Sequence, residues 1–382
     1  MSTAGEGLPE QAWLHARLDD LVARQGSDLF LSANAPPAIK VNGQFVRLSN
    51  QSLSGHNTLA IARAIMTPNQ LNNFQQTKES NFAIAPPHRP RFRVNAFMQL
   101  GQVGMVFRGI AATPPSLEGL GLPPALKAIA LQKRGLIILV GATGAGKSST
   151  LAAMVDCINQ NTRGHIVSVE DPIEFLHPHK QCLVTQREIG IDTSDWSVAL
   201  KNALRQAPDV IVVGELRDRE STDQAVSFSE TGHLVLATMH ANNTNQALER
   251  IVSFFPENKR AQLYMDLSLN LRALVAQRLV HKADGTGRLA AVEIMVNTPL
   301  ISGLIRKGDI PGIRTAMGSH RAEGMQTFQD VLFDLYESAA ITLDDALRNA
   351  DSLNDLRLQI KLHSKRAGIN DGSSGIDNLG IL

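Results

Sequence analysis

A glycine-rich octapeptide, GATGAGKS at residues 141–148, has the residue types and spacing of a phosphate-binding loop. It fits the pattern G-x-x-x-x-G-K-[ST] at every fixed position. Glycines let such a backbone turn so that successive N–H groups converge on phosphate oxygens. Lys147 is placed to neutralise the β- and γ-phosphates, and the Ser148 hydroxyl to bind Mg²⁺. The loop therefore predicts that ATP or GTP binds here together with Mg²⁺.

Two acidic segments follow further along the chain. The first, VEDPIEF at residues 169–175, places three carboxylates after an apolar run, where one of them can orient or deprotonate a water molecule. The second, VIVVGE, is an apolar run that ends at Glu215, a Walker B arrangement with Glu where Asp is usual. Glu215 is predicted to hold Mg²⁺ through water. Acids after a strand are also often helix caps, so each segment has a structural alternative.

A third segment, TGHLVLATMH, places His233 before and His240 after another apolar run. A histidine close to a γ-phosphate can report its presence by hydrogen bonding. Histidines at strand ends are more often structural when they occur alone. The order and spacing relative to the phosphate loop favour a role at the nucleotide.

The elements that must position these residues alternate between strands and helices. Residues 136–140, 166–169, 210–213 and 234–237 are continuous apolar runs, typical of strands buried on both faces of a parallel sheet. The three polar segments then lie at or near the ends of such strands. The pattern predicts a doubly wound α/β domain, which binds ligands beyond the carboxyl ends of its strands.

Residues 1–110 predict a separate small α+β domain. Apolar residues at helical spacing predict helices over residues 10–25 and 56–75. Asn42-Gly43 is a strong hairpin signal. Strands are predicted over residues 28–32, 38–41, 44–48, 92–100 and 104–109.

Residues 111–124, rich in proline and glycine, predict a linker, although a loop within one domain has the same composition. The ATPase domain is then predicted over residues 125–365, followed by a flexible tail over residues 366–382. From residue 258 onward the domain is predicted to be helical. These helices are expected over residues 258–280, 298–307, 325–338 and 343–364.

Composition narrows the class of protein. The 382 residues are 43% hydrophobic and 19% charged with a net charge of +1, which is typical of a soluble globular protein. No long Lys/Arg run is present, which argues against a nucleic-acid partner, although a local basic patch is compatible with a neutral total. Cys157 and Cys182 cannot form a four-cysteine zinc site and are predicted to be reduced thiols. We expect no signal peptide, no membrane span and a cytoplasmic location.

The four segments together resemble the secretion ATPases, the hexameric motors of type IV pili and type II secretion. GATGAGKSS, VEDPIEF, VIVVGELRD and TGHLVLATMH resemble the Walker A, Asp, Walker B and His boxes of that superfamily. The resemblance runs from about residue 27 to about residue 364. It implies a RecA-like ATPase domain preceded by a small PAS-like domain, with ATP and Mg²⁺ as cofactors.

The resemblance also assigns roles to individual residues. Glu174 is the predicted water-activating base, and His233 is ranked ahead of His240 as the γ-phosphate sensor. Arginines of the N-terminal domain in this family reach a nucleotide, often that of a neighbouring subunit. Arg91, Arg93 and Arg108 are the candidates, each with the alternative of a surface cation on a strand. The implied nucleotide-binding residues are Gly141, Thr143, Gly144, Ala145, Gly146, Lys147, Ser148 and Ser149, and the implied metal ligands are Ser148 and Glu215.

Within the superfamily the chain resembles the type IV pilus retraction ATPases, the PilT/PilU family, and more the PilU branch than the PilT branch. It begins directly with the short N-terminal domain and lacks the zinc cysteines of the assembly motors. Residues 300–306 depart from the AIRNLIRE-like motif of the PilT branch, which favours an accessory role.

The resemblance implies a mechanical motor for pilus retraction. Its partners would be further copies of the chain in a hexamer, a PilT-like ATPase, and an inner-membrane platform protein at the pilus base. Two alternatives remain: a DNA translocase or helicase on the same core, and a scaffold that has lost turnover.

Overall fold

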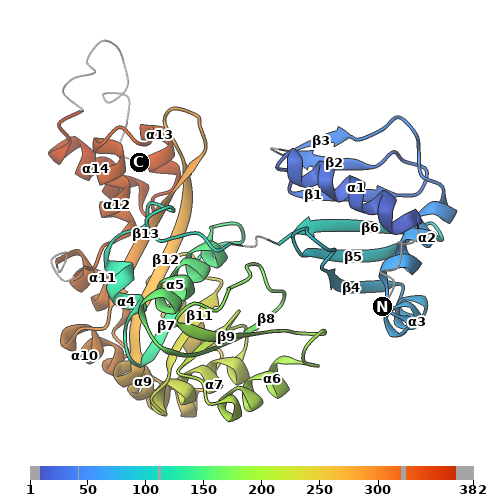
Figure 1. The fold of residues 1–382 in the computed structure, drawn as a ribbon. Helices are drawn as coiled ribbons and strands as arrows, with labels where there is room; N and C mark the ends of the chain where they lie inside the picture. Colours follow the sequence, from blue (N-terminus) through green and yellow to red (C-terminus); the bar gives the residue numbers. More distant parts are fainter. Residues whose placement is uncertain (1–8, 42, 111–112, 320–323, 367–382) are drawn as a thin grey trace. The chain divides into compact units, whose positions relative to one another are not determined.

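The computed structural model describes residues 9–41, 43–110, 113–319 and 324–366. The chain divides into two compact units (Figure 1). The first comprises the residues up to Thr113 together with Glu174–Leu176, and the second comprises the rest of the chain from Pro114 onward. Asn42 of the predicted hairpin, residues 111–112 of the predicted linker and residues 367–382 of the predicted tail lie outside the described residues.

The first unit is a six-stranded antiparallel sheet with helices packed on one face. Its strand order is β3-β2-β1-β6-β5-β4. Leu29, Phe82, Val94 and Phe107 alternate along their strands with exposed or half-buried residues and form the core under the helices. The elements are α1 (Pro9–Ala23), β1 (Asp28–Ser32), β2 (Ala38–Val41), β3 (Gln44–Arg47), α2 (Gly55–Ile65), α3 (Pro68–Thr77), β4 (Glu79–Ile84), β5 (Phe92–Gln99) and β6 (Gln102–Gly109).

The single helix predicted over residues 56–75 is wrong, because two helices occupy this stretch. Thr67 has an extended backbone, its hydroxyl accepts from Gln70 N, and the Gln70 side chain accepts from Thr67 N. This capping box, with Pro68 in the first turn, starts a new helix. Strand β4 was not predicted.

The second unit contains a seven-stranded sheet in the order β13-β12-β7-β11-β10-β8-β9. All neighbouring pairs are parallel except β12 and β13, which are antiparallel. This confirms the predicted α/β fold with a parallel sheet. The strands are β7 (Gly135–Val140), β8 (Gly164–Glu170), β9 (Cys182–Glu188), β10 (Val210–Val213), β11 (Leu234–Met239), β12 (Leu271–His281) and β13 (Arg288–Val296).

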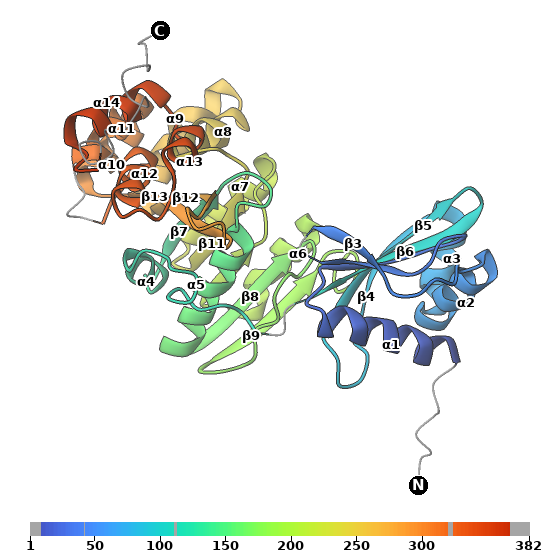
Figure 2. The same cartoon turned by 90° about the horizontal axis from the view of Figure 1, so that it is seen from above.

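Helices cover both faces of this sheet (Figure 2). In β7, Ile137 and Leu139 pack with α4 and α5, whereas Leu136, Ile138 and Val140 belong to the core on the other face, which the remaining helices share. Each such side chain contributes about 1.5–3 kcal/mol by leaving water. The helices are α4 (Ala125–Ala130), α5 (Lys147–Asn161), α6 (Trp196–Ala203), α7 (Arg219–Glu230), α8 (Thr244–Ser253), α9 (Glu257–Asn270), α10 (Pro299–Lys307), α11 (Ile310–Ser319), α12 (Phe328–Glu337), α13 (Leu343–Arg348) and α14 (Leu353–His363), with a 3₁₀ turn at Leu204–Gln206.

The helix predicted over residues 258–280 is wrong in its second half. Helix α9 ends at Asn270, and the next residue begins β12, which pairs with β7 on one side and β13 on the other. The stretch is rich in Leu, Ala, Gln and Arg, which favour helices. Pairing with two neighbouring strands outweighs that local preference. Among the described residues, none of the helices combines the length and the apolar character that crossing a membrane requires.

Candidate nucleotide site

The phosphate loop joins the buried strand β7 to helix α5, and its glycines are required by its geometry. Gly144 and Gly146 have φ of +78° and +88°, in the left-handed region that favours glycine. A Cβ on Gly146 would lie 2.7 Å from Gln277 Nε2, and one on Gly141 would lie 2.7 Å from Gln277 O. A larger residue at Gly141 would therefore displace the loop from the β12 backbone, and one at Gly146 would push the Gln277 amide aside and strain the backbone.

Helix α5 begins at this loop without a side-chain cap. Its N-cap residue is Gly146, which offers no side-chain oxygen to the first-turn N–H groups. The helix is 15 residues long, so its N-terminus carries a partial positive charge beside these donors. The ammonium of Lys147 donates to the carbonyls of Gly141 (2.8 Å) and Ala142 (2.9 Å) and so lies over the loop. Convergent N–H groups and an ammonium make this a site for a polyanion.

Gln277 in β12 supports the loop from behind and was missed by sequence reasoning. The buried Thr150 hydroxyl in α5 donates to Gln277 Oε1 at 2.6 Å. Gln277 therefore fixes the first turns of α5 against the sheet, beside Gly141 and Gly146. No local signal marked it, because it lies in the stretch predicted to be helical.

Glu215 and His240 lie at the carboxyl edge of the sheet, where β7 also delivers the loop. Glu215 follows β10 and His240 follows β11, and His240 Nε2 lies 3.2 Å from Glu215 Oε1. The Glu215 side chain is 35% exposed and the His240 side chain is 41% exposed. A hydrogen bond from Leu216 N to Thr238 O (2.8 Å) ties the two strand ends together. The structure thus pairs a carboxylate and an imidazole that are 25 positions apart in sequence.

A pocket of about 450 Å³ joins His240 to the phosphate loop. The pocket belongs wholly to the second unit, and both the loop and the segment after β11 line it. His240 therefore shares a pocket with the first two residues of the phosphate loop. The lining residues are Gly141, Ala142, His240, Ala241, Asn242, Gln246, Glu249, Arg250 and Ser253.

The structure places the two histidines at opposite ends of β11. β11 runs parallel to β7 with Leu234 opposite Gly135 and Met239 opposite Val140, so His233 precedes the amino end of the strand. His233 Nδ1 lies 3.1 Å from Phe228 O, inside the turn after α7. The six residues of β11, about 20 Å of strand, separate His233 from the carboxyl edge of the sheet, where the phosphate loop lies. His233 therefore lies at the edge away from the loop and His240 at the edge near it, and the sensor role of either histidine stays a prediction.

The carboxylates of the first acidic segment have different surroundings. Glu170 Oε1 accepts from Ser168 Oγ (2.9 Å) and Gln186 Nε2 (3.2 Å), and Asp171 lies 3.4 Å from an Arg217 nitrogen. Glu174 is exposed and is grouped with the first unit. Its role as the water-activating base stays a prediction.

Arg93 and Arg108 lie opposite each other on β5 and β6 of the first unit. Both are on the sheet face away from Val94 and Phe107 of the core. Arg108 Nε donates to Oδ1 of the buried Asp28 at 2.8 Å, whereas within the described part of the chain the Arg93 side chain makes no hydrogen bond or ion pair. Arg91 directly precedes β5.

Comparisons with known proteins show which family the chain belongs to. The family model described as "Type II/IV secretion system protein" matches residues 10–328. The chain is 54% identical to the type IV pilus ATPase PilU of Pseudomonas aeruginosa over 90% of both chains. It is 41% identical to the retraction ATPase PilT of the same organism, over 86% of this chain and 95% of that protein.

The chain belongs to the type II/IV secretion system protein family. The predicted resemblance to the PilT/PilU ATPases is thereby confirmed. A crystal structure of the pilus retraction motor PilT with bound ADP matches with a TM-score of 0.84 and 35% identity, covering 89% of this chain and 97% of that one. The fold, including the small N-terminal domain, and the assignment as an ATPase that binds nucleotide are confirmed as well.

The residues at the carboxyl edge fit a magnesium nucleotide. Within the described ranges no group of three or more His, Cys, Asp or Glu side chains could hold a metal by itself. Mg²⁺ does not need such a cage, because it keeps several waters and binds through one or two protein oxygens and the phosphates. The Ser148 hydroxyl and the Glu215 carboxylate are oxygen ligands of this kind.

Proposed function

We propose that this chain is an ATP-hydrolysing motor that powers type IV pilus retraction and twitching motility, as an accessory to a PilT-like ATPase. The observation that carries the proposal is the arrangement of His240, paired with Glu215, in one pocket with the phosphate loop. A phosphate loop by itself supports nucleotide binding. A half-exposed carboxylate and imidazole beside it support turnover as well.

Each group has a definite task in this proposal. Bound MgATP supplies the phosphoanhydride bond and the ion that offsets its charge. The N–H groups of residues 144–148 and the Lys147 ammonium hold the phosphates, while Ser148 and Glu215 hold Mg²⁺, Glu215 through water. Contact with Glu215 orients the His240 ring so that its other nitrogen can hydrogen-bond to the γ-phosphate. Glu174 orients and deprotonates the attacking water.

The motor is proposed to be a homo-hexamer whose sites are completed by a neighbouring subunit. An arginine on the first unit would stabilise charge on the neighbour's nucleotide, with residues 111–124 as the hinge. Arg93 is the better candidate, because Arg108 is already bound to Asp28. Arg91 is the third candidate.

The partners follow from the same resemblance. We propose a cytoplasmic location at the pilus base, with docking to an inner-membrane platform protein and assembly with a PilT-like ATPase. Residues 300–306 lie on α10 and depart from the PilT-branch motif, which supports the accessory role.

Genetics and enzymology together test the proposal. The gene and that of its PilT-like partner are deleted separately and together, and twitching is scored; we expect reduced twitching in each single deletion. ATPase activity of the purified protein is measured alone, with the partner, and with single-stranded DNA. Wild-type twitching after deletion of the gene would contradict the motor assignment. Hydrolysis that is stimulated by DNA and not by the partner would favour a translocase instead.

A further inference from the structure

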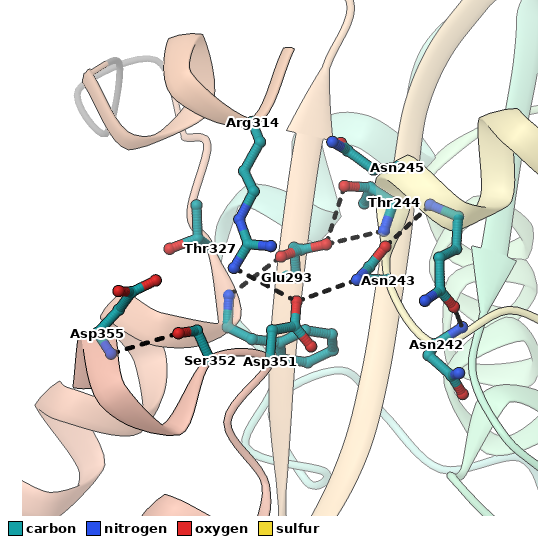
Figure 3. A network of polar contacts seen from close by, with 12 residues as sticks. Asn242, Asn243, Thr244, Asn245, Glu293, Arg314, Thr327, Asp351, Ser352 and Asp355 are labelled. Atoms are coloured by element: carbon teal, nitrogen blue, oxygen red, sulfur yellow. Dashed lines mark hydrogen bonds and ion pairs between the residues drawn. The ribbon is translucent and has the colours of Figure 1, made fainter. Parts of the chain in front are cut away.

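Residues 242–244, which follow His240 and lead into α8, are held by side chains from distant parts of the chain (Figure 3). Arg278 in β12 donates to the carbonyl of Asn242 at 3.0 Å. The Asn243 amide donates to Asp351 Oδ2 at 3.0 Å. The backbone N–H and the hydroxyl of Thr244 both donate to Glu293 Oε1 at 2.8 Å. Three consecutive residues thus have three separate partners.

Glu293 in β13 is the most buried of these partners, with 5% of its surface exposed. Besides Thr244, the backbone N–H of Phe328 donates to its Oε2 at 3.1 Å. Thr244 and Phe328 are the first residues of α8 and α12, so two helix N-termini meet at one carboxylate. Burial raises the pKa of Glu293, while the hydrogen bonds from Thr244 and Phe328 act in the opposite direction. Three hydrogen-bond donors and two helix N-termini with partial positive charge surround Glu293, and they favour a carboxylate that only accepts hydrogen bonds.

Arg278 and Asp351 form a second connection, next to the first. Their side chains pair, and Arg278 also donates to the carbonyl of Asn349 and stacks over the Phe328 ring at 4.0 Å. Arg314 lies 3.8 Å from Asp351. Asp351 is in the turn between α13 and α14, so residues 242–244 are bonded directly to that turn and are linked to the start of α12 through Glu293.

The start of α8 also has a cap within its own sequence. Asn243 caps the helix by itself, because its Oδ1 accepts from Gln246 N at 2.9 Å. The bonds to Arg278, Asp351 and Glu293 therefore add a constraint on where the segment lies. Ala241 and Asn242 line the same pocket as His240 and the phosphate loop, so this position bears directly on the site.

We propose that Glu293, Arg278 and Asp351 are positioning residues for ATP hydrolysis, acting through His240. They hold residues 242–244 so that His240 faces Glu215 and the phosphate loop, and they bond this segment to α12 and to the α13–α14 turn. The inference rests on the proposed role of His240 at the γ-phosphate.

The test is a double-mutant cycle on the full chain. Glu293→Gln keeps the shape of the side chain but puts an N–H₂ group among donors. We expect kcat for ATP to fall about 10-fold, the low end for loss of an outer-shell partner. KM should stay within about 2-fold, because the loop itself is untouched. In a His240→Ala background the same change should lower kcat less than about 2-fold further, because its effect passes through the missing imidazole.

Asp355→Asn is the matched control, since Asp355 is an exposed carboxylate on α14 away from residues 242–244 (Figure 3). It should leave kcat within about 2-fold of wild type. If Glu293→Gln does not give folded protein by circular dichroism, Asp351→Asn, which weakens the contact to Asn243, replaces it in the cycle.

The inference would be overturned if kcat were unchanged in the Glu293→Gln protein, or in the Asp351→Asn protein that replaces it. It would also be overturned if the substitution lowered kcat equally with and without His240. Lys147→Ala separates this from the proposed function. ATP hydrolysis that survives Lys147→Ala contradicts the site as a whole, whereas hydrolysis that requires Lys147 but not the network contradicts the inference alone.

Discussion

Strand β11 has a histidine next to each end, and the two side chains have different surroundings. His233, at the amino end, lies within hydrogen-bond distance of Thr231 Oγ1 and Phe228 O in the preceding turn. His240, at the carboxyl end, meets Glu215 and a pocket that includes the phosphate loop.

The same contrast holds for the neighbouring strands. At the amino edge, His165 Nδ1 lies 2.9 Å from Gln206 O and its Nε2 lies 2.8 Å from Thr185 Oγ1, while Asp209 accepts from His165 N at 2.8 Å. At the carboxyl edge Lys147 and Glu215 keep exposed surface beside the pocket. Polar groups at both edges are bonded within the protein, but Lys147 and Glu215 also keep exposed surface at the carboxyl edge, where α/β domains bind ligands.

The largest expected effect is that of removing one positive charge, Lys147, from the carboxyl edge. Lys147→Ala should lower kcat on the order of 10²-fold or more, because it removes a cation placed against the phosphates. Lys133→Ala is the matched control, since Lys133 is an exposed lysine just before the amino end of β7. Steady-state ATP hydrolysis measures both. Equal losses in the two variants would remove the distinction between the edges.

The histidine pair is the direct comparison. His240→Ala should lower kcat about 10²-fold, in the range for a positioned proton donor or acceptor, and His233→Ala should stay within about 2-fold. Nucleotide affinity, followed with a fluorescent ATP analogue, should change little in either protein. A greater loss in the His233→Ala protein would restore the order that the sequence suggested.

A substitution of Gln277 is expected to affect both the stability of the fold and the binding of ATP. Gln277→Leu should lower the free energy of unfolding by about 1–3 kcal/mol, because the buried Thr150 hydroxyl loses its acceptor. KM for ATP should rise as well, since the side chain supports Gly146. Asp209→Asn weakens a contact at the amino edge and should lower stability with KM unchanged. Urea unfolding and ATPase kinetics distinguish the two.

The smallest effect concerns His177, a half-buried histidine after the first acidic segment. Burial lowers its pKa from 6.5 to about 4. The unfolded chain then binds a proton below pH 6.5 that the folded chain takes up only near pH 4, so stability falls as the pH falls through this window. A difference of one bound proton changes the free energy of unfolding by about 1.4 kcal/mol per pH unit. We expect a loss of roughly that size between pH 7 and pH 5.5. His177→Gln should remove that part of the pH dependence of urea unfolding. An unchanged pH dependence would mean that His177 titrates alike in both states.

Local sequence predicted the elements whose conformation is set within a few residues. Strands β1 and β10 match their predicted bounds, because a short apolar run between turn residues has few alternatives. Helix–strand ambiguity misplaced β12, whose pairing partners β7 and β13 are distant or later in the chain. Gln277 was missed as part of the same error. Strand β9 was missed too, since its VTQ stretch lacks the apolar run of a doubly buried strand.

The sequence by itself predicted a phosphate-binding loop at residues 141–148, because a loop with Gly144 and Gly146 at positive φ, followed at once by a helix, is specified by contiguous residues. It also determined the family, through four boxes in order. Only the tertiary structure decided which histidine meets the loop. The spacing of His233 and His240 around β11 is compatible with either, and it is the parallel pairing of β11 with β7 that brings one end of the strand to the loop and carries the other end away.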